Sequence, residues 1–85
     1  MNDVNSYTII DIRSLTQYNK GHIPGAVSID AYDLISNPAK YLEKNKTYYI
    51  YCNSGIQSEA LVEKLIFLGY SAVNIGSYRD YLHKR

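Results

Sequence analysis

The stretch that decides the fold is TYYIYCNSGIQSEALVEKLIFLGY, residues 47–70, because it joins a strand pattern directly to a helix pattern. Residues 47–52 are β-branched, aromatic and apolar, which predicts a buried strand. The apolar residues that follow recur at helical spacing, which predicts a helix over 58–69 with a glycine at its end. The only cysteine of the chain, Cys52, lies where the predicted strand stops.

Strand and helix patterns alternate on both sides of this stretch. Strands are predicted at 7–12, near 27–29 and at 71–76, and helices at 15–19 behind Ser14, at 38–44 and after Ser77, with a helical turn from Asp30 to Leu34. Such alternation predicts an α/β fold, a small parallel sheet of four to five strands flanked by helices on both faces. Strands covered on both sides are continuous apolar runs, as 7–12 and 47–52 are.

Length, charge and composition narrow the classes of function. With 85 residues the chain has room for a single domain, 1–85, and its net charge of +1 without a basic stripe argues against nucleic-acid binding. No apolar run approaches the ~20 residues of a membrane span. The first residues, MNDVNSY, do not resemble a signal peptide, so we expect a cytoplasmic protein. One cysteine and two histidines make a disulfide, a metal site or another cofactor unexpected.

Cys52 stands at the carboxyl end of the strongest strand, which is where open α/β sheets bind ligands. The loop after it leads into the best helix, so backbone N–H groups and the positive end of the helix dipole should converge on the thiol. Such surroundings favour a reactive thiolate over an inert buried thiol. Gly55 allows the loop to bend, and Asn53 and Ser54 are small and polar enough for a tight exposed turn.

Four segments resemble, in order, the motifs of single-domain rhodaneses and rhodanese-like sulfurtransferases. These segments are IIDIR (9–13), YNKGHIPGAVSI (18–29), YYIYCNSGIQS (48–58) and ALVEKLIFLGYSAVNIGS (60–77). The resemblance spans about Tyr7 to Tyr81. It implies an N-terminally trimmed version of the family's five-stranded parallel sheet.

The resemblance also implies a reaction, in which Cys52 carries a sulfane sulfur as a persulfide. The donors would be thiosulfate or persulfides, and the acceptors thiols or cyanide, with a protein acceptor as a further option. The loop implied to hold the persulfide is Asn53, Ser54, Gly55, Ile56, Gln57 and Ser58. The motif residues to which we assign a structural role are Asp11, Arg13, Gly21, His22, Pro24 and Gly25.

The chain departs from the family pattern at several positions. Gln17 replaces a common carboxylate, so Arg13 is expected to lack its usual partner. Gln57 replaces a common arginine, which should weaken attraction for the thiosulfate dianion because charge-assisted hydrogen bonds are stronger than neutral ones. Gly76 is followed by Ser77 where the family often has two glycines.

Two other classes of function compete with sulfur transfer. A cysteine phosphatase needs an arginine six residues after its cysteine to clamp phosphate, and that position is Ser58. A catalytically silent binding module on the same fold stays open, because a fold alone does not prove activity. The gain of a sulfur atom on Cys52 would separate the enzyme from the silent module.

Overall fold

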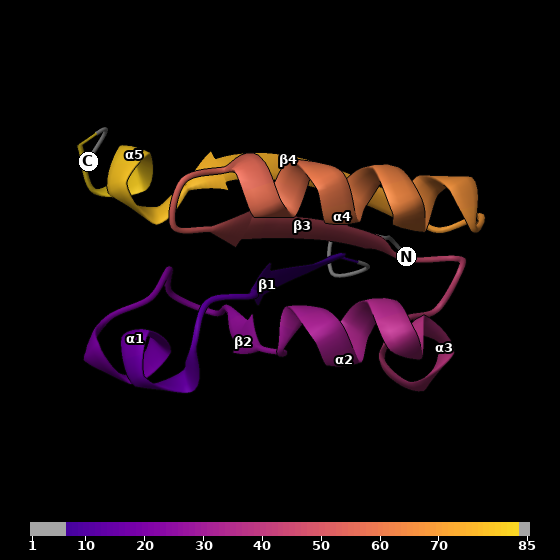
Figure 1. The fold of residues 1–85 in the computed structure, drawn as a ribbon, viewed down its shortest axis with the longest axis horizontal. Helices are drawn as coiled ribbons and strands as arrows, with labels where there is room; N and C mark the ends of the chain where they lie inside the picture. Colours follow the sequence, from indigo (N-terminus) through magenta and orange to yellow (C-terminus); the bar gives the residue numbers. More distant parts are fainter. Residues whose placement is uncertain (1–6, 84–85) are drawn as a thin grey trace, which may run out of the picture.

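The computed structural model describes residues 7–83, and these contain one parallel sheet (Figure 1). Its strands are β1 (Tyr7–Asp11), β2 (Val27–Ser28), β3 (Thr47–Cys52) and β4 (Ser71–Ser77). All neighbouring strands pair in parallel, in the order β2-β1-β3-β4. The predicted α/β fold with a four- to five-stranded parallel sheet is confirmed.

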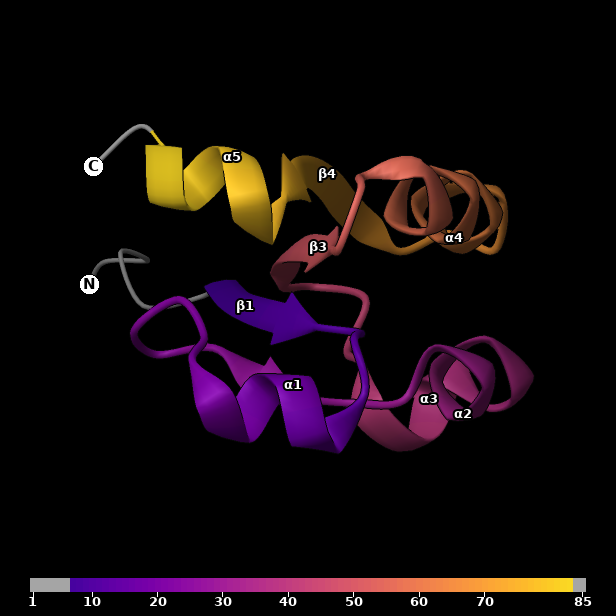
Figure 2. The same cartoon turned by 60° about the vertical axis from the view of Figure 1, so that its left-hand side comes forward.

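Helices cover both faces of this sheet (Figure 2). They are α1 (Leu15–Lys20), α2 (Ala31–Ser36), α3 (Pro38–Tyr41), α4 (Ile56–Phe67) and α5 (Tyr78–His83). One face carries α2, α3 and α4, and the other carries α1 and α5. None of the helices within residues 7–83 is long and apolar enough to cross a membrane.

The two faces have separate cores because successive side chains of a strand point to opposite sides. On β3, Ile50 and Cys52 join the large cluster under α2, α3 and α4. Tyr51, between them, joins a smaller cluster with Ile23 and Ala26, against which α1 and α5 pack. Burying an isoleucine such as Ile50 contributes about 1.5–3 kcal/mol to stability. Because Tyr51 is buried on the opposite face, side chains on both sides of β3 hold the strand in place.

The helix boundaries differ from the sequence prediction, most clearly in α3 and α4. α4 begins at Ile56 instead of residue 58, because Gly55 precedes it in the left-handed conformation with φ of 88°. α3 ends at Tyr41 and does not reach residue 44, since Leu42 is extended and buried in the core. The loop between β3 and α4 is therefore shorter than the sequence suggested.

Strand β4 contains an irregularity beside this loop. Asn74 pairs with Ile50, but the next pair joins Gly76 to Tyr51, so Ile75 is an extra residue on β4. A bulge of this kind bends a strand and re-aims its side chains. It leaves Asn74 on the same side of the sheet as Ile50, beneath the start of α4.

Candidate functional site

Cys52 is a buried thiol whose sulfur is surrounded by hydrogen-bond donors. Cys52 is the last residue of β3 and is only 2% exposed. The Gly55 N–H donates to Sγ at 3.1 Å and the Ser58 N–H at 3.3 Å. The two donors come from the residue before α4 and from its first turn, where N–H groups have no partner within the helix. The loop therefore turns backbone dipoles onto the sulfur, as the strand-to-helix pattern predicted.

These donors decide the ionisation of the thiol. Burial by itself raises the pKa of Cys52, because a low dielectric disfavours the thiolate. The Ser58 hydroxyl and the N–H groups of Ser58, Gly55 and Ser54 oppose this effect and bring the pKa below its ordinary value. A lowered pKa is what a nucleophilic cysteine requires, since the thiolate is the attacking species.

Ser58 hydrogen-bonds the Cys52 sulfur, and Asn74 in turn hydrogen-bonds Ser58. Ser58 is completely buried, and its Oγ lies 3.3 Å from Cys52 Sγ and 2.6 Å from Asn74 Oδ1. Sequence reasoning placed Ser58 in the loop but missed Asn74. The available signal was an asparagine in a short apolar strand, where this residue type is depleted.

The remaining loop residues are exposed and face two different hollows. Asn53 exchanges two hydrogen bonds with the Gln17 amide of α1, at 3.1 and 3.2 Å. A pocket of about 250 Å³ beside the loop is lined by Asn53, Ser54, Ser77, Arg79 and Asp80. Gln57 lines a different hollow, which includes residues of α2 and α4. The position that carries arginine in many family members is therefore directed toward the helices of that face.

The opposite face of the sheet holds a buried ion pair between Arg13 and Asp11. The guanidinium makes contacts of 2.8 to 3.1 Å with both carboxylate oxygens, and the Arg13 N–H donates to Oδ1 at 2.8 Å. Position 17 therefore supplies no carboxylate to Arg13, as expected, but Asp11 takes its place as the partner. Asp11 supplies the carboxylate because the backbone bends after β1, and Gln17 offers only its carbonyl oxygen, at 3.5 Å. Burial opposes the charge of Arg13, but the bonds to Asp11 raise its pKa.

Tyr51 and the segment after α1 complete this network. The Tyr51 hydroxyl donates to Asp11 Oδ2 at 2.6 Å and accepts the Ile23 N–H at 3.1 Å. Arg13 also donates to the carbonyl oxygen of Gly21 at 2.6 Å. Among the described residues, no buried side-chain nitrogen or oxygen lacks a hydrogen-bond partner, which is what makes burying an ion pair tolerable.

The GHIPGA segment forms a turn that returns the chain to β2. The Ala26 N–H donates to the Ile23 oxygen at 2.9 Å, with Pro24 and Gly25 between them. Gly25 has φ of 88°, the conformation that a type II turn requires after proline. His22 Nδ1 donates to the Tyr18 oxygen at 2.8 Å, and the imidazole stacks on the Tyr18 ring. This segment lies on the far side of β3 from Cys52.

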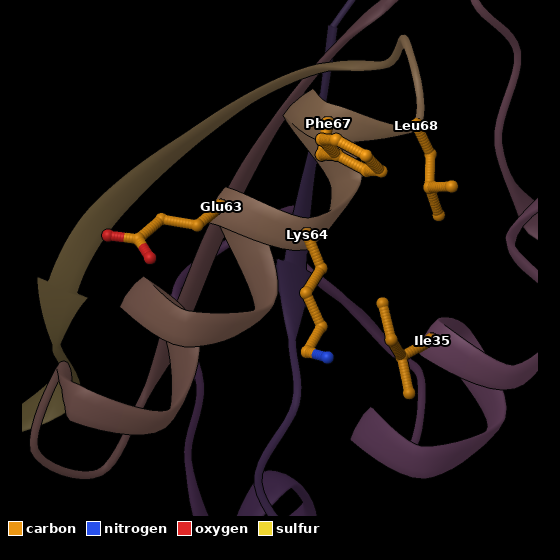
Figure 3. A pocket seen from close by; sticks show the side chains of 5 residues that line it. All are labelled: Ile35, Glu63, Lys64, Phe67 and Leu68. Carbon is orange, nitrogen blue, oxygen red and sulfur yellow. The ribbon is translucent and has the colours of Figure 1, made fainter.

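A further hollow, of about 410 Å³, lies between α2 and the end of α4 (Figure 3). Phe67 and Leu68 face Ile35 across it, and the Lys64 side chain extends along its edge toward Ile35 (Figure 3). The hollow is lined by no cysteine, serine or histidine, and it lies at the opposite end of α4 from Cys52. Within residues 7–83, no three His, Cys, Asp or Glu side chains gather where a metal ion could be held. Cys52 is therefore the best candidate for chemistry.

Comparison with known proteins identifies the family. The model of the rhodanese-like domain matches residues 1–84. The chain belongs to the rhodanese-like domain family. This finding fits the parallel sheet and the position of Cys52 at the carboxyl end of β3.

Similar proteins include several named sulfurtransferases. The thiosulfate sulfurtransferase PspE of Escherichia coli is 37% identical over 73 residues, which are 84% of this chain and 70% of PspE. A tRNA sulfurtransferase of Thermoplasma acidophilum is 38% identical over 64 residues, but the match spans 75% of this chain and only 12% of that enzyme.

Solved structures agree with the fold. An Escherichia coli rhodanese with anions superposes with a TM-score of 0.77 at 34% identity, covering 87% of this chain and 89% of the other. A human single-domain sulfurtransferase superposes with a TM-score of 0.80 at 26% identity, covering 94% and 84%.

Proposed function

We propose that this chain is a sulfurtransferase that carries sulfane sulfur as a persulfide on Cys52. The observation that carries the proposal is the bonding of Cys52 Sγ to the N–H groups of Gly55 and Ser58 at the start of α4. The sulfurtransferase names of relatives such as PspE support the same class of reaction.

The first half-reaction loads sulfur onto the protein. The Cys52 thiolate attacks the outer sulfur of a donor such as thiosulfate, forming a new S–S bond to Sγ. The S–S bond within the donor breaks, and sulfite leaves with the bonding electron pair. Cys52 is left as a persulfide, a covalent intermediate that divides one transfer into two steps.

The second half-reaction unloads it. A thiolate or cyanide attacks the outer sulfur, the S–S bond to Sγ breaks, and the Cys52 thiolate is restored with that electron pair. N–H groups of residues 53–58 stabilise the negative outer sulfur in between, as an oxyanion hole stabilises oxygen. A sulfur-accepting protein could take the place of the small acceptor.

The donor enters beside the loop, through the pocket that Asn53 and Ser54 line. The residues that line this pocket include one cation, Arg79, and one anion, Asp80. The attraction of Arg79 for the thiosulfate dianion is therefore offset by repulsion from Asp80. Gln57 is directed toward another hollow and adds no charge. Thiosulfate is therefore a weak donor, and a thiol persulfide or a protein persulfide is a better one.

The motif residues of the other face have a structural role in this proposal. Asp11 and Arg13 fix the end of β1 to Gly21, and His22, Pro24 and Gly25 shape the turn into β2. None of the described hydrogen bonds of Cys52 involves these residues, and no proton from His22 is needed for either half-reaction. The cytoplasmic location and the single domain over 1–85 stay predictions.

Mass spectrometry of the intact protein tests the proposal. After incubation with thiosulfate or a low-molecular-weight persulfide, the wild type should gain about 32 Da, and a thiol or cyanide should remove it. Cys52→Ala should gain nothing, and Cys52→Ser is the matched control that keeps a similar side chain. A wild-type protein that gains no mass from any donor is the silent binding module instead.

A further inference from the structure

The Ser58 hydroxyl has more acceptors than protons. Its Oγ lies 2.6 Å from Asn74 Oδ1, 3.2 Å from the Gly55 carbonyl oxygen and 3.3 Å from Cys52 Sγ. A hydroxyl donates one proton, so only one of these atoms can receive it at a time. Ser58 is fully buried, so these three atoms compete for its proton away from bulk solvent.

The bonds of Asn74 show which acceptor has the proton when Cys52 is a neutral thiol. Asn74 Nδ2 donates to the Gly55 oxygen at 3.2 Å, and Oδ1 accepts the Gly76 N–H at 3.0 Å. These two partners fix the orientation of the amide, so Oδ1 faces Ser58 as an acceptor. The Ser58 hydroxyl donates along this short contact, and its oxygen is left to accept the S–H of Cys52.

Ionisation of the thiol reverses the direction of the chain. A thiolate can only accept hydrogen bonds, so Ser58 must turn its proton from Asn74 toward Sγ. Asn74 Oδ1 keeps the Gly76 N–H after the exchange and is not left without a partner. The hydroxyl thus stabilises the thiolate only when it gives up its bond to Asn74.

We propose that Asn74 is a positioning residue that competes with Cys52 for the Ser58 proton and so sets how readily the thiol ionises. This inference rests on the proposed function of Cys52 and adds a residue of β4 to it. Asn74 makes no contact with Sγ among its described hydrogen bonds and acts through Ser58.

The fold gives Asn74 this position through the bulge in β4. The extra residue, Ile75, lets Asn74 and Gly76 both approach the loop. A Cβ added to Gly55 would meet the Gly76 carbonyl carbon at 3.3 Å, which shows how closely β4 and the loop are packed. Asn74 therefore holds the loop through Gly55 and the hydroxyl through Ser58.

Charged groups also surround the site, but the variants below leave them unchanged. The charged and titratable groups on the described elements around Cys52 are Tyr7 and Asp11 on β1, Arg13 after it, Tyr48, Tyr49 and Tyr51 on β3, Tyr32 and Asp33 on α2, Lys40 and Tyr41 on α3, Glu59, Glu63 and Lys64 on α4, and Tyr78, Arg79, Asp80, Tyr81 and His83 on α5. Differences among the variants in the ionisation of Cys52 therefore report on the hydroxyl and the amide.

The test is the pH dependence of alkylation by iodoacetamide, with Cys52 as the single reactive thiol. Four proteins are compared: wild type, Asn74→Ala, Ser58→Ala and the double variant. Asn74→Ala should lower the pKa of Cys52 and raise the rate at neutral pH about three- to tenfold, since one competing hydrogen bond is lost. Ser58→Ala should raise the pKa. The shift caused by Asn74→Ala should be much smaller in the Ser58→Ala background than in the wild type, because the competition for the Ser58 proton is then absent and only the Asn74 bond to the Gly55 oxygen is lost.

Asn74→Leu is the second variant, since it removes the competing acceptor while filling the space and should shift the pKa in the same direction. The inference is overturned if the pKa stays the same or rises in the Asn74 variants, or if it shifts equally in the Ser58→Ala background. It is also overturned if neither Asn74 variant folds, because the amide is then needed for stability alone. Alkylation needs no sulfur donor, so failure of sulfur loading would count against the proposed function and leave this result intact.

Discussion

Tyr51 and Cys52 are neighbours on β3 and are both buried, at 0% and 2% exposure, yet their pKa values shift in opposite directions. Burial raises the pKa of each group. Tyr51 then donates to the Asp11 carboxylate, which raises its pKa further, whereas Cys52 accepts from Ser58 and Gly55 and its pKa falls.

The difference teaches that burial does not determine reactivity by itself. The Asp11 carboxylate holds the Tyr51 proton, which fits the structural role that we propose for that face of the sheet. The donors around Cys52 favour its thiolate, which fits the nucleophile that we propose on the other face. One strand supplies both because alternate residues point to opposite sides.

Breaking the network on the Tyr51 face should have the largest effect on stability. Arg13→Met leaves the Asp11 carboxylate buried without its cation, which should cost about 3–5 kcal/mol in the free energy of unfolding measured with urea. Lys46→Met is the matched control, because the Lys46–Glu43 pair is largely exposed and should contribute under about 1 kcal/mol. Similar losses in both variants would mean that Arg13 is not the anchor of this face.

The opposite pKa shifts should give opposite dependences of stability on pH. Folding lowers the pKa of Cys52, so between the folded and the unfolded pKa the unfolded chain binds more protons than the folded one. The wild type should therefore gain stability relative to Cys52→Ala as the pH rises through this range toward about 8.5. Because folding raises the pKa of Tyr51, its contribution is present below about pH 10 and is lost above it, relative to Tyr51→Phe.

The measurement is the free energy of unfolding of the three proteins from about pH 6 to about pH 11. If the stability difference between wild type and variant changed with pH in the same direction for Cys52 and Tyr51, the contrast between the two faces would be contradicted.

Charge at the loop should have the smallest effect, on donor preference alone. Gln57→Arg adds a cation near the loop and should lower the KM for thiosulfate by roughly three- to tenfold, since charge-assisted hydrogen bonds are stronger than neutral ones. Gln57→Met is the control that changes polarity without charge, and stability should change by less than about 0.5 kcal/mol in both. An unchanged KM would show that a cation at residue 57 does not reach the donor.

The sequence predicted the elements that depend on local pattern. The apolar runs of β1 and β3, the cap at Ser14 and the left-handed Gly69 were all recognisable, because each depends on residues a few positions apart. Cys52 was placed at the end of its strand for the same reason.

The partners of the site could not be predicted from local pattern. Asn74 meets Ser58 across 16 residues of sequence, and only because β4 has an extra residue at Ile75. Arg13 meets Asp11 through a bend after β1 that strand periodicity does not encode. Contacts of this kind depend on register and backbone bending, which appear only when the sheet is assembled.

The central claim, that hydrogen-bond donors keep Cys52 ionised despite burial, is tested most directly by the pH profile of alkylation of the wild-type protein. The chain has a single cysteine, so the rate reports on this thiol alone. The midpoint should lie below the ordinary value of about 8.5. A midpoint at or above that value would show that burial outweighs the donors, and would contradict the account.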